Sequence, residues 1–543
     1  MTISPRDLLA RHALAEIPKI LTLLDRTPVS RTYGCFDRIF WHYRMIDFPC
    51  GMSQEFVYPL ALAWSLDIPG NPYFQAPAIR DFIEAGIRFA ARSAHPDGSC
   101  DDYYPFERAA GAAAFSLLAC LEAAGIIGVQ DDPEIRDFFR RRAHWLATHR
   151  ESGRLSNHEA LIVANLIRMS ALDGEAWEEP LRARAARLLS WQDEEGWFDE
   201  YGGADPGYLS LTIGLMADSD RRRPDLGLRA ACGRAIGFFA HFVHPDGTVG
   251  GSYTSRGTQN FFPHGFEIAA DWMPEATAIN DRALALFAGD GPPCYADDHI
   301  IGHHLWSWLL CWSEWRDERP SPDQPQADNQ ADISVTCFPR AGLLIDRRGG
   351  QSLYCGMHQG GAFQIFSGAR LALADSGIAI HTRTGKAAVQ HLAGEYAITR
   401  DADGLSVSGS MAWAKATLLT PVKSVILRCM MITLGRFFPD LVRRLLQKIL
   451  VTGRREAPFR FHRSLRWNGA GWVIRDEIVA EQGWQDITLI GIAGFQTSST
   501  TIMARVWQAN HLQPWHDLTP LLANLGPGDP LIVERLVPAG DAA

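Results

Sequence analysis

The turn AHPDGSCDDYYP at residues 94–105 is the first of four similar turns from which the fold of the chain is inferred. Each turn carries a Gly after charged or polar residues, and the other three are HRESGRLSNHEA (149–160), QDEEGWFDEYGG (192–203) and VHPDGTVGGSYT (243–254). The glycines, at positions 98, 153, 196 and 247, are 55, 43 and 51 residues apart. This spacing fits one helical hairpin per repeat, and such hairpins bury their apolar faces by stacking on their neighbours.

The segments between these turns have the apolar periodicity of helices, as in FIEAGIRFAARSA (82–94) and AAGAAAFSLLACLEAAGI (109–126). We therefore predict a helical domain over residues 1–317. Helical hairpins that curve around a centre form an incomplete (α/α) toroid, whose turns at one end surround a cleft.

A Pro- and Asp-rich run follows, and we predict a linker over residues 318–332. Residues 333–543 then contain short β-branched and aromatic runs separated by Gly, Asn and Asp, which predicts an antiparallel β-sandwich domain. The predicted fold class is multidomain α+β, with helices first and strands second.

Residues 422–455 interrupt the β pattern with an apolar segment that has eight Lys or Arg and one Asp. The segment reads as a basic amphipathic insertion of one or two helices. A packed surface helix explains it. The alternative is an interfacial helix that touches anionic lipid or an anionic polymer.

Composition excludes some classes of protein. A net charge of −10 argues against general nucleic-acid binding but leaves room for an anionic ligand in a local cationic cleft. The ten Cys are scattered, which is typical of reduced thiols in the cytoplasm. We see no signal peptide and no stretch long enough to span a bilayer, so we expect a cytoplasmic protein, with the inner membrane surface as the alternative location. The oligomeric state is not predicted.

The four turns also hold polar side chains that a helical repeat does not require. The second holds Asn157 and His158, Tyr208 follows the third, and Arg256 follows the fourth. Amide, imidazole, phenol and guanidinium are the groups required for β-elimination from a uronic acid. The further polar residues expected to bind substrate are Tyr104, Tyr201, Tyr253, Gln259 and His264.

The chemistry explains why these groups are needed together. The C5 proton of a uronate is poorly acidic while its carboxylate is ionised, so an Asn amide helped by Arg must stabilise the charge that develops there. A Tyr or His takes the proton, and a Tyr protonates the departing oxygen. A Tyr acts as a base only where nearby cations favour the phenolate, and Arg256 is the expected cation.

Each residue also has a structural explanation. Asn157 is a good helix N-cap, His158 a first-turn surface residue and Tyr208 a core aromatic. A second chemical interpretation is a glycoside hydrolase that uses two carboxylates, Asp102 with either Glu200 or Asp205.

The arrangement resembles the heparinase II/III-like polysaccharide lyases and their oligo-alginate lyase relatives, over roughly residues 30–535. In that family an Asn-His pair in the toroid is followed by a catalytic Tyr ahead of a helix. Asn157-His158 and Tyr208, 50 residues later, match this order, with Tyr201 as the fallback. The resemblance implies that Asn157 neutralises the substrate carboxylate and that His158 and Tyr208 share the base and acid work.

The resemblance extends to LYCGMHQGGAFQIFSGARLALADSG, which contains His358 and Asp375, 17 residues apart. In family members such residues bind a structural zinc or line the cleft. Here the positions two residues before and after His358 are Gly356 and Gly360. A third ligand is not obvious, with His381, His391 and His462 all possible, whereas zinc needs three or four ligands. We therefore predict no metal and no cofactor, place His358 among the substrate-binding residues, and keep zinc at His358 and Asp375 as the alternative.

The leading hypothesis is a polysaccharide lyase that cleaves a uronate-containing anionic glycan, such as a glycosaminoglycan or alginate. The alternatives are a non-catalytic glycan-binding or polysaccharide-assembly protein of the same fold, and the toroid hydrolase. Fold alone does not determine chemistry.

Overall fold

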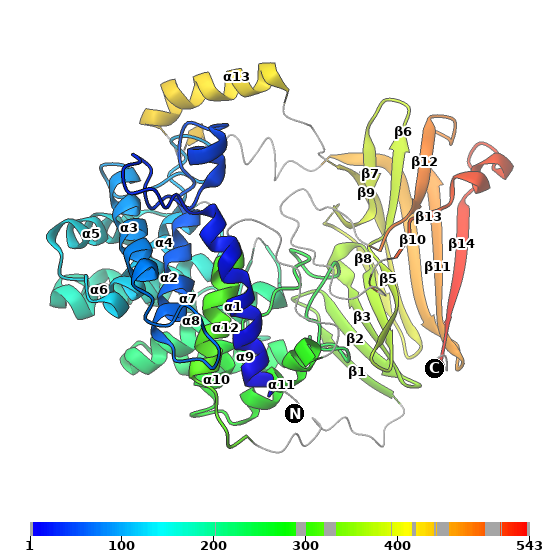
Figure 1. The fold of residues 1–543 in the computed structure, drawn as a ribbon. Helices are drawn as coiled ribbons and strands as arrows, with labels where there is room; N and C mark the ends of the chain where they lie inside the picture. Colours follow the sequence, from blue (N-terminus) through cyan, green and yellow to red (C-terminus); the bar gives the residue numbers. More distant parts are fainter. Residues whose placement is uncertain are drawn as a thin grey trace.

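The fold is seen in a computed structural model, which describes residues 4–151, 153–200, 202–288, 300–319, 333–392, 394–414, 420–438, 441–442, 455–494, 511 and 513–539. The chain forms a helical part followed by a β part, and the two lie side by side (Figure 1). The predicted fold class is therefore confirmed. Most of the predicted linker 318–332 lies outside the described residues.

The helical part is a toroid of two rings. The inner helices contact one another in chain order, and the last contacts the first; they are α2 (Val57–Ser65), α4 (Ala110–Ile127), α6 (Ser156–Asp173), α8 (Pro206–Arg222), α10 (His264–Ala269) and α12 (Ile300–Ser313). The outer helices pack behind them and are α1 (Pro5–Leu23), α3 (Pro77–Ser93), α5 (Pro133–Thr148), α7 (Glu178–Leu189), α9 (Leu228–Ala240) and α11 (Glu275–Ala288). Short helical turns complete this part at η1 (Ile39–Tyr43), η2 (Met52–Phe56), η3 (Gly174–Trp177) and η4 (Pro224–Leu226).

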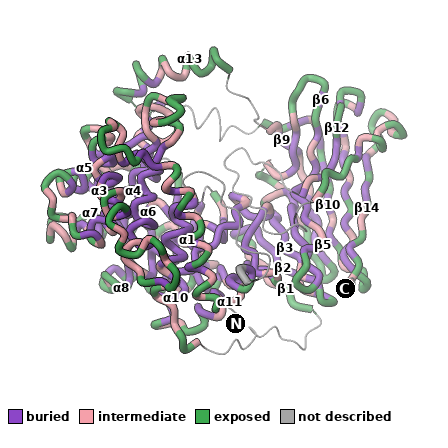
Figure 2. The backbone as a smooth tube through the Cα atoms, viewed as in Figure 1, coloured by how far each residue is buried: buried purple, intermediate pink, exposed green. Residues whose placement is uncertain are grey.

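Helix α4 shows why the inner ring is buried. Its sequence is apolar on all sides, and almost every residue of the helix is buried between α2 and α6 (Figure 2). By length and composition alone α4 is long and apolar enough to cross a membrane, whereas the sequence analysis predicts no such stretch. Of the residues of α4, 83% are buried within the protein, as expected of a core helix.

The first and fourth of the repeated turns share a hydrogen-bond pattern. In the first, Gly98 donates to the His95 carbonyl at 2.8 Å, and Asp97 accepts from the Ser99 amide at 3.0 Å. The fourth repeats this pattern with Gly247 and Asp246. Gly98 has φ +88° and lies against α5, so a side chain there is excluded both by backbone conformation and by space.

The β part consists of two antiparallel sheets. The smaller is a five-stranded meander in chain order, formed by β1 (Ile333–Phe338), β2 (Leu343–Arg348), β3 (Gln351–Gly356), β4 (Ala362–Ser367) and β5 (Arg370–Asp375). The larger has the order β13-β12-β6-β7-β9-β10-β11-β14, with β8 paired to β9. Its strands are β6 (Ile378–Thr382), β7 (Ala387–Val389), β8 (Ala397–Arg400), β9 (Gly404–Ala414), β10 (Glu456–Trp467), β11 (Gly471–Ala480), β12 (Ile487–Ile492), β13 (His516–Asp517) and β14 (Leu531–Pro538). Short turns η5 (Met357–Gln359), η6 (Gln390–Leu392) and η10 (Thr519–Asn524) connect them.

The five-stranded sheet is the middle layer of the molecule. Leu344 and Leu353 pack in the core between the two sheets, whereas Leu343, Ile345 and Tyr354 pack in the core of the helical part. Successive side chains of a strand point to opposite faces, so this sheet is buried on both sides. The sandwich therefore attaches directly to the toroid.

The described part of the basic insertion contains α13 (Pro421–Met430) and η7 (Met431–Gly435). It leaves the larger sheet after β9 and lies over one end of the helical part (Figure 1). There Arg428 forms an ion pair with Asp47 of the helical part at 2.7 Å.

Candidate functional site

The start of α6 is joined to the third turn through Glu200. The Asn157 Nδ2 donates to Glu200 Oε1 at 3.0 Å, and the backbone amide and hydroxyl of Ser156 donate to Oε2 at 3.1 and 3.0 Å. The helix begins at Ser156, so the interpretation of Asn157 as N-cap is wrong. Glu200, from the neighbouring turn, accepts the hydrogen bond of the Ser156 backbone amide at the helix start. The buried Asn157 side chain, through its own bond to Glu200, connects the two turns.

His158 points in a different direction from its neighbour. Its Nδ1 is hydrogen-bonded to Glu151 of the same turn at 2.8 Å, and its ring meets the Phe115 ring edge-on at 6.3 Å. The ring lies directly over Gly111 of α4, where a Cβ would be 2.5 Å from it. The imidazole is thus held in position by a carboxylate and two residues of α4.

Tyr208 and Arg256 are brought together by Asp205. The Asp205 side chain caps α8 by accepting from the Tyr208 amide at 3.0 Å. It also accepts from the Arg256 amide at 3.2 Å and from the Thr254 hydroxyl at 3.0 Å. This arrangement places the Arg256 guanidinium over the Tyr208 ring, 5.2 Å from its centroid.

Glu200 connects the two halves of the group electrostatically. Burial raises the pKa of the Glu200 carboxyl, while the charges of Arg256 and His158 act to lower it. Asn157 contacts this buried carboxylate, the charges of His158 and Arg256 act on it, and Tyr208 lies against Arg256; we call these four residues with Glu200 the Glu200 cluster. The four residues predicted to be catalytic are thus linked through Glu200 and Arg256, and their catalytic role stays a prediction.

The members of the Glu200 cluster differ in exposure. Asn157, Glu200 and Arg256 are buried, whereas Tyr208 and His158 are half-buried. A ligand at this surface would meet the phenol and the imidazole first. The amide of Asn157 and the guanidinium of Arg256 are buried.

The predicted substrate-binding residues are placed differently from one another. Gln259 is buried, and neither atom of its amide has a hydrogen-bond partner among the described residues. Buried polar atoms of this kind usually meet a water or a ligand. Tyr104 is half-buried in the first turn, and Tyr201 lies outside the described residues. His264 is buried over Gly214 and hydrogen-bonded to Ser307 at 2.9 Å, and burial lowers its pKa to about 4.

Tyr253 belongs to the interface between the two parts of the molecule. Its side chain has no exposed surface, and its hydroxyl is hydrogen-bonded to His244 Nε2 at 2.8 Å. Its ring lies 5.9 Å from that of Tyr354 on β3. We therefore assign Tyr253 to interdomain packing rather than to a substrate surface.

His358 and Asp375 have separate environments. His358 is exposed in η5. Asp375 is fully buried and forms ion pairs with Arg463 at 2.9 Å and with Arg535 at 2.6 Å. Among the described residues, no three His, Cys, Asp or Glu side chains are grouped as a metal site would require. Asp375 therefore belongs to a buried ion-pair network, to which His358 does not contribute.

Two acidic partners escaped the sequence analysis. Glu151 holds His158, and Glu55 of η2 is hydrogen-bonded to His303 of α12 at 2.9 Å. The Phe115 ring stacks on the His303 ring, with the centroids 4.6 Å apart, and it also contacts the His158 ring. Glu151 lies seven residues before His158, so the sequence gives only a weak indication that the two side chains meet. Glu55 lies 248 residues from His303, and the sequence gives no indication of that contact.

The carboxylates required by the hydrolase hypothesis are engaged within the chain. Asp205 accepts the hydrogen bonds that shape the α8 start, and Glu200 accepts those of Ser156 and Asn157. Asp102 accepts from the Cys50 thiol at 2.9 Å. Neither proposed pair presents two exposed carboxyls to one glycosidic bond.

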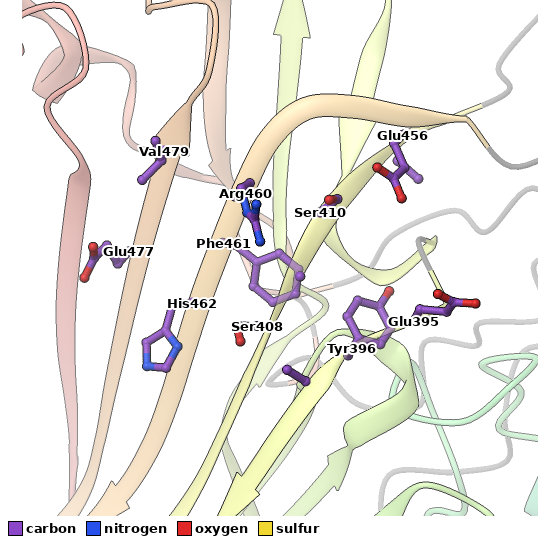
Figure 3. A pocket seen from close by; sticks show the side chains of 13 residues that line it. Glu395, Tyr396, Ser408, Ser410, Glu456, Arg460, Phe461, His462, Glu477 and Val479 are labelled. Carbon is purple, nitrogen blue, oxygen red and sulfur yellow. The ribbon is translucent and has the colours of Figure 1, made fainter.

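A separate hollow of about 980 Å³ lies on the larger sheet (Figure 3). Its lining comes from β8 to β11 and the residues just before β8, and includes Tyr396, Arg460, His462 and Glu477. The charges in it are of both signs. It contains none of the residues predicted from the sequence to form the site.

Comparison with known proteins gives a fold but no family. No family model and no curated protein matches the chain. Among solved structures, a xanthan lyase from Paenibacillus aligns with a TM-score of 0.50 and 10% identity, over 89% of this chain and 46% of that one. A heparinase III aligns with a TM-score of 0.43 and 11% identity, over 90% of this chain and 72% of that one. A chondroitin AC lyase from Streptomyces coelicolor aligns with a TM-score of 0.46 and 9% identity, over 90% of this chain and 67% of that one. This chain spans less than half of the xanthan lyase, and the likeness supports the helical-toroid-plus-β architecture alone.

Proposed function

We propose that this protein is a polysaccharide lyase that cleaves a uronate-containing anionic glycan by β-elimination. The observation that carries the proposal is the position of the Arg256 guanidinium over the half-buried Tyr208 ring, with the charges of Arg256 and His158 acting on the carboxylate that Asn157 contacts. The fold is shared with a protein named xanthan lyase, which is consistent with this reaction.

In the proposed mechanism the role of each residue follows from how exposed its side chain is. Tyr208 and His158, which are half-buried, exchange protons with C5 and with the leaving oxygen. Arg256 supplies positive charge beside the phenol and toward the substrate carboxylate. Glu151 positions His158 by its hydrogen bond to Nδ1.

Asn157 enters the mechanism only if its amide changes partner. Its Nδ2 donates to Glu200, and the side chain is buried. A substrate carboxylate would have to replace Glu200 as the acceptor. Burial raises the pKa of Glu200, which reduces the cost of protonating this carboxyl when a second carboxylate arrives.

The test is a panel of acidic polysaccharides and their oligomers, including glycosaminoglycans, alginate and xanthan, incubated with the protein. The readout is the ultraviolet absorbance of an unsaturated uronate product. We expect His158→Ala and Tyr208→Phe each to lower kcat by about 10²-fold or more, because each removes a proton-transfer group. Tyr73→Phe is the control, since Tyr73 lies in the α2–α3 connection, outside the Glu200 cluster.

The outcomes separate the hypotheses. An absorbance signal that both variants lose and Tyr73→Phe retains supports the lyase. New reducing ends without absorbance, abolished by Asp102→Asn, would indicate a hydrolase. Glycan binding without any product would indicate a non-catalytic binding or assembly protein.

A further inference from the structure

Helix α13 exposes an apolar stripe. Val422, Val425 and Ile426 expose 69, 62 and 61% of their surface, and Cys429 is exposed as well. These positions follow the i, i+3, i+4, i+7 spacing of one helical face. Leu427, on another face, and Met430, at the edge of the stripe one turn after Ile426, are half-buried. A solvent-facing stripe of this kind is the reverse of what a packed surface helix presents.

The stripe continues beyond α13 and across to the helical part. Among the described residues from 431 to 442, the apolar side chains that expose half of their surface or more are Ile432, Leu434, Phe437, Phe438 and Leu441. In the helical part, Ile39, Tyr43 and Met45 are also exposed, in and just after η1. The Arg428–Asp47 ion pair holds these two segments together. We call these exposed side chains, with those of the α13 stripe, the α13 surface.

The charge of the insertion is opposite to that of the molecule. Residues 420–438 contain Lys423, Arg428 and Arg436 and no acidic residue, in a chain of net charge −10. Exposed apolar and aromatic side chains beside cations are the composition of a helix that lies in the interface of an anionic bilayer.

We propose that the α13 surface docks the protein on a membrane that contains anionic lipid. The apolar stripe would enter the boundary between headgroups and acyl chains, and Lys423 and Arg436 would contact the headgroups. An anionic glycan is disfavoured as the occupant because it has no apolar phase to cover Val425, Ile426 or Phe437. The α13 helix lies at one end of the molecule, away from the bulk of the sheets, and is among its most exposed helices (Figures 1 and 2). The inference does not depend on the lyase proposal.

The test is co-sedimentation of the full chain with vesicles of equal parts phosphatidylcholine and phosphatidylserine, compared with phosphatidylcholine alone. We expect binding to the anionic vesicles that weakens with added salt. The double variant Val425→Glu with Phe437→Glu should lose at least about tenfold in affinity, because both charged side chains would enter the apolar layer. Lys423→Gln with Arg436→Gln should lose about thirtyfold on anionic vesicles. Leu536→Glu is the matched control, as Leu536 is 54% exposed on β14 of the larger sheet.

A second measurement, the fluorescence of a label on α13, tests the proposal without the glutamate variants and so does not depend on how they fold. Cys429 is the exposed cysteine of the described residues, and an environment-sensitive fluorophore can be attached there after Cys294→Ser removes a cysteine that lies outside them. Anionic vesicles should shift its emission to that of an apolar environment. Absence of sedimentation and of the shift would overturn the proposal. It would also fail if the glutamate variants abolished self-association of the protein, or if a soluble anionic glycan rather than vesicles produced the shift.

Discussion

Adjacent residues at the start of α6 have different tasks. Asn157 reaches the third turn through Glu200, while His158 is held by Glu151 of its own turn. Neighbouring side chains on a helix point about 100° apart, so an amide and an imidazole at adjacent positions contact different parts of the protein. The pair therefore joins two turns of the toroid and leaves only the imidazole partly exposed.

At the residue scale we predict that Asp375→Ala is severely destabilising. It would leave the buried Arg463 without one of its two carboxylates, so we expect the free energy of unfolding to fall by about 3–5 kcal/mol. Asp401→Ala is the control, because Asp401 pairs with Arg466 at the surface and should cost less than about 1 kcal/mol. Denaturant unfolding measures both. If a chelator lowered the Tm of the wild type as much as Asp375→Ala does, Asp375 would be a metal ligand instead.

At the scale of the element, the repeated turn depends on a glycine that touches the next helix. A Cβ on Gly98 would lie 2.4 Å from the Arg142 amide nitrogen of α5, and φ is +88°. Gly128, which ends α4, has φ +75° but open space around it. The two positions therefore separate the cost of backbone conformation from the cost of the clash.

We predict that Gly128→Ala lowers the free energy of unfolding by about 1 kcal/mol, since only the left-handed conformation is unfavourable. Gly98→Ala should cost a further 1–3 kcal/mol or so, because the turn must move away from α5. Thermal unfolding of the two variants side by side measures the difference. Equal losses would show that the turn does not depend on its contact with α5.

At the scale of the whole molecule, the toroid and the sandwich meet through buried aromatic and imidazole groups. His244 is hydrogen-bonded to Tyr253 and lies against Tyr354 and Phe366 of the five-stranded sheet. Burial lowers the pKa of His244 to about 4, so the imidazole is neutral in the folded protein near neutral pH. The interface is therefore sensitive to acid.

We predict that stability falls as the pH is lowered from about 6.5 to about 4. The unfolded chain takes up a proton on His244 near its ordinary pKa, whereas the folded protein does so only near pH 4. The loss amounts to about 3 kcal/mol for this group, and His264, with the same lowered pKa, adds to it. Unfolding of wild type and His244→Gln across this range checks the prediction. The variant should show a smaller loss between these two pH values, and His381→Gln, at an exposed position, should behave as wild type.

Local patterns in the sequence determined the architecture. Apolar periodicity, the Gly-containing turns and the change to β-branched runs each depend on residues close in the chain, and they predict a toroid followed by an antiparallel sandwich. The prediction of the four catalytic residues has the same basis, since each lies at or just after a repeated turn.

Only the tertiary structure decided how these residues are used. Asn157 meets Glu200 across 43 residues, and Glu55 meets His303 across 248, because closure of the helical ring sets those distances. Tyr253 and Asp375 are site candidates in the sequence, but Tyr253 is buried against the β part, and Asp375 is buried between the two sheets in ion pairs with Arg463 and Arg535. A polar side chain at a turn has the same sequence signature whether it faces solvent or a neighbouring layer, and only the packing of those layers distinguishes the two.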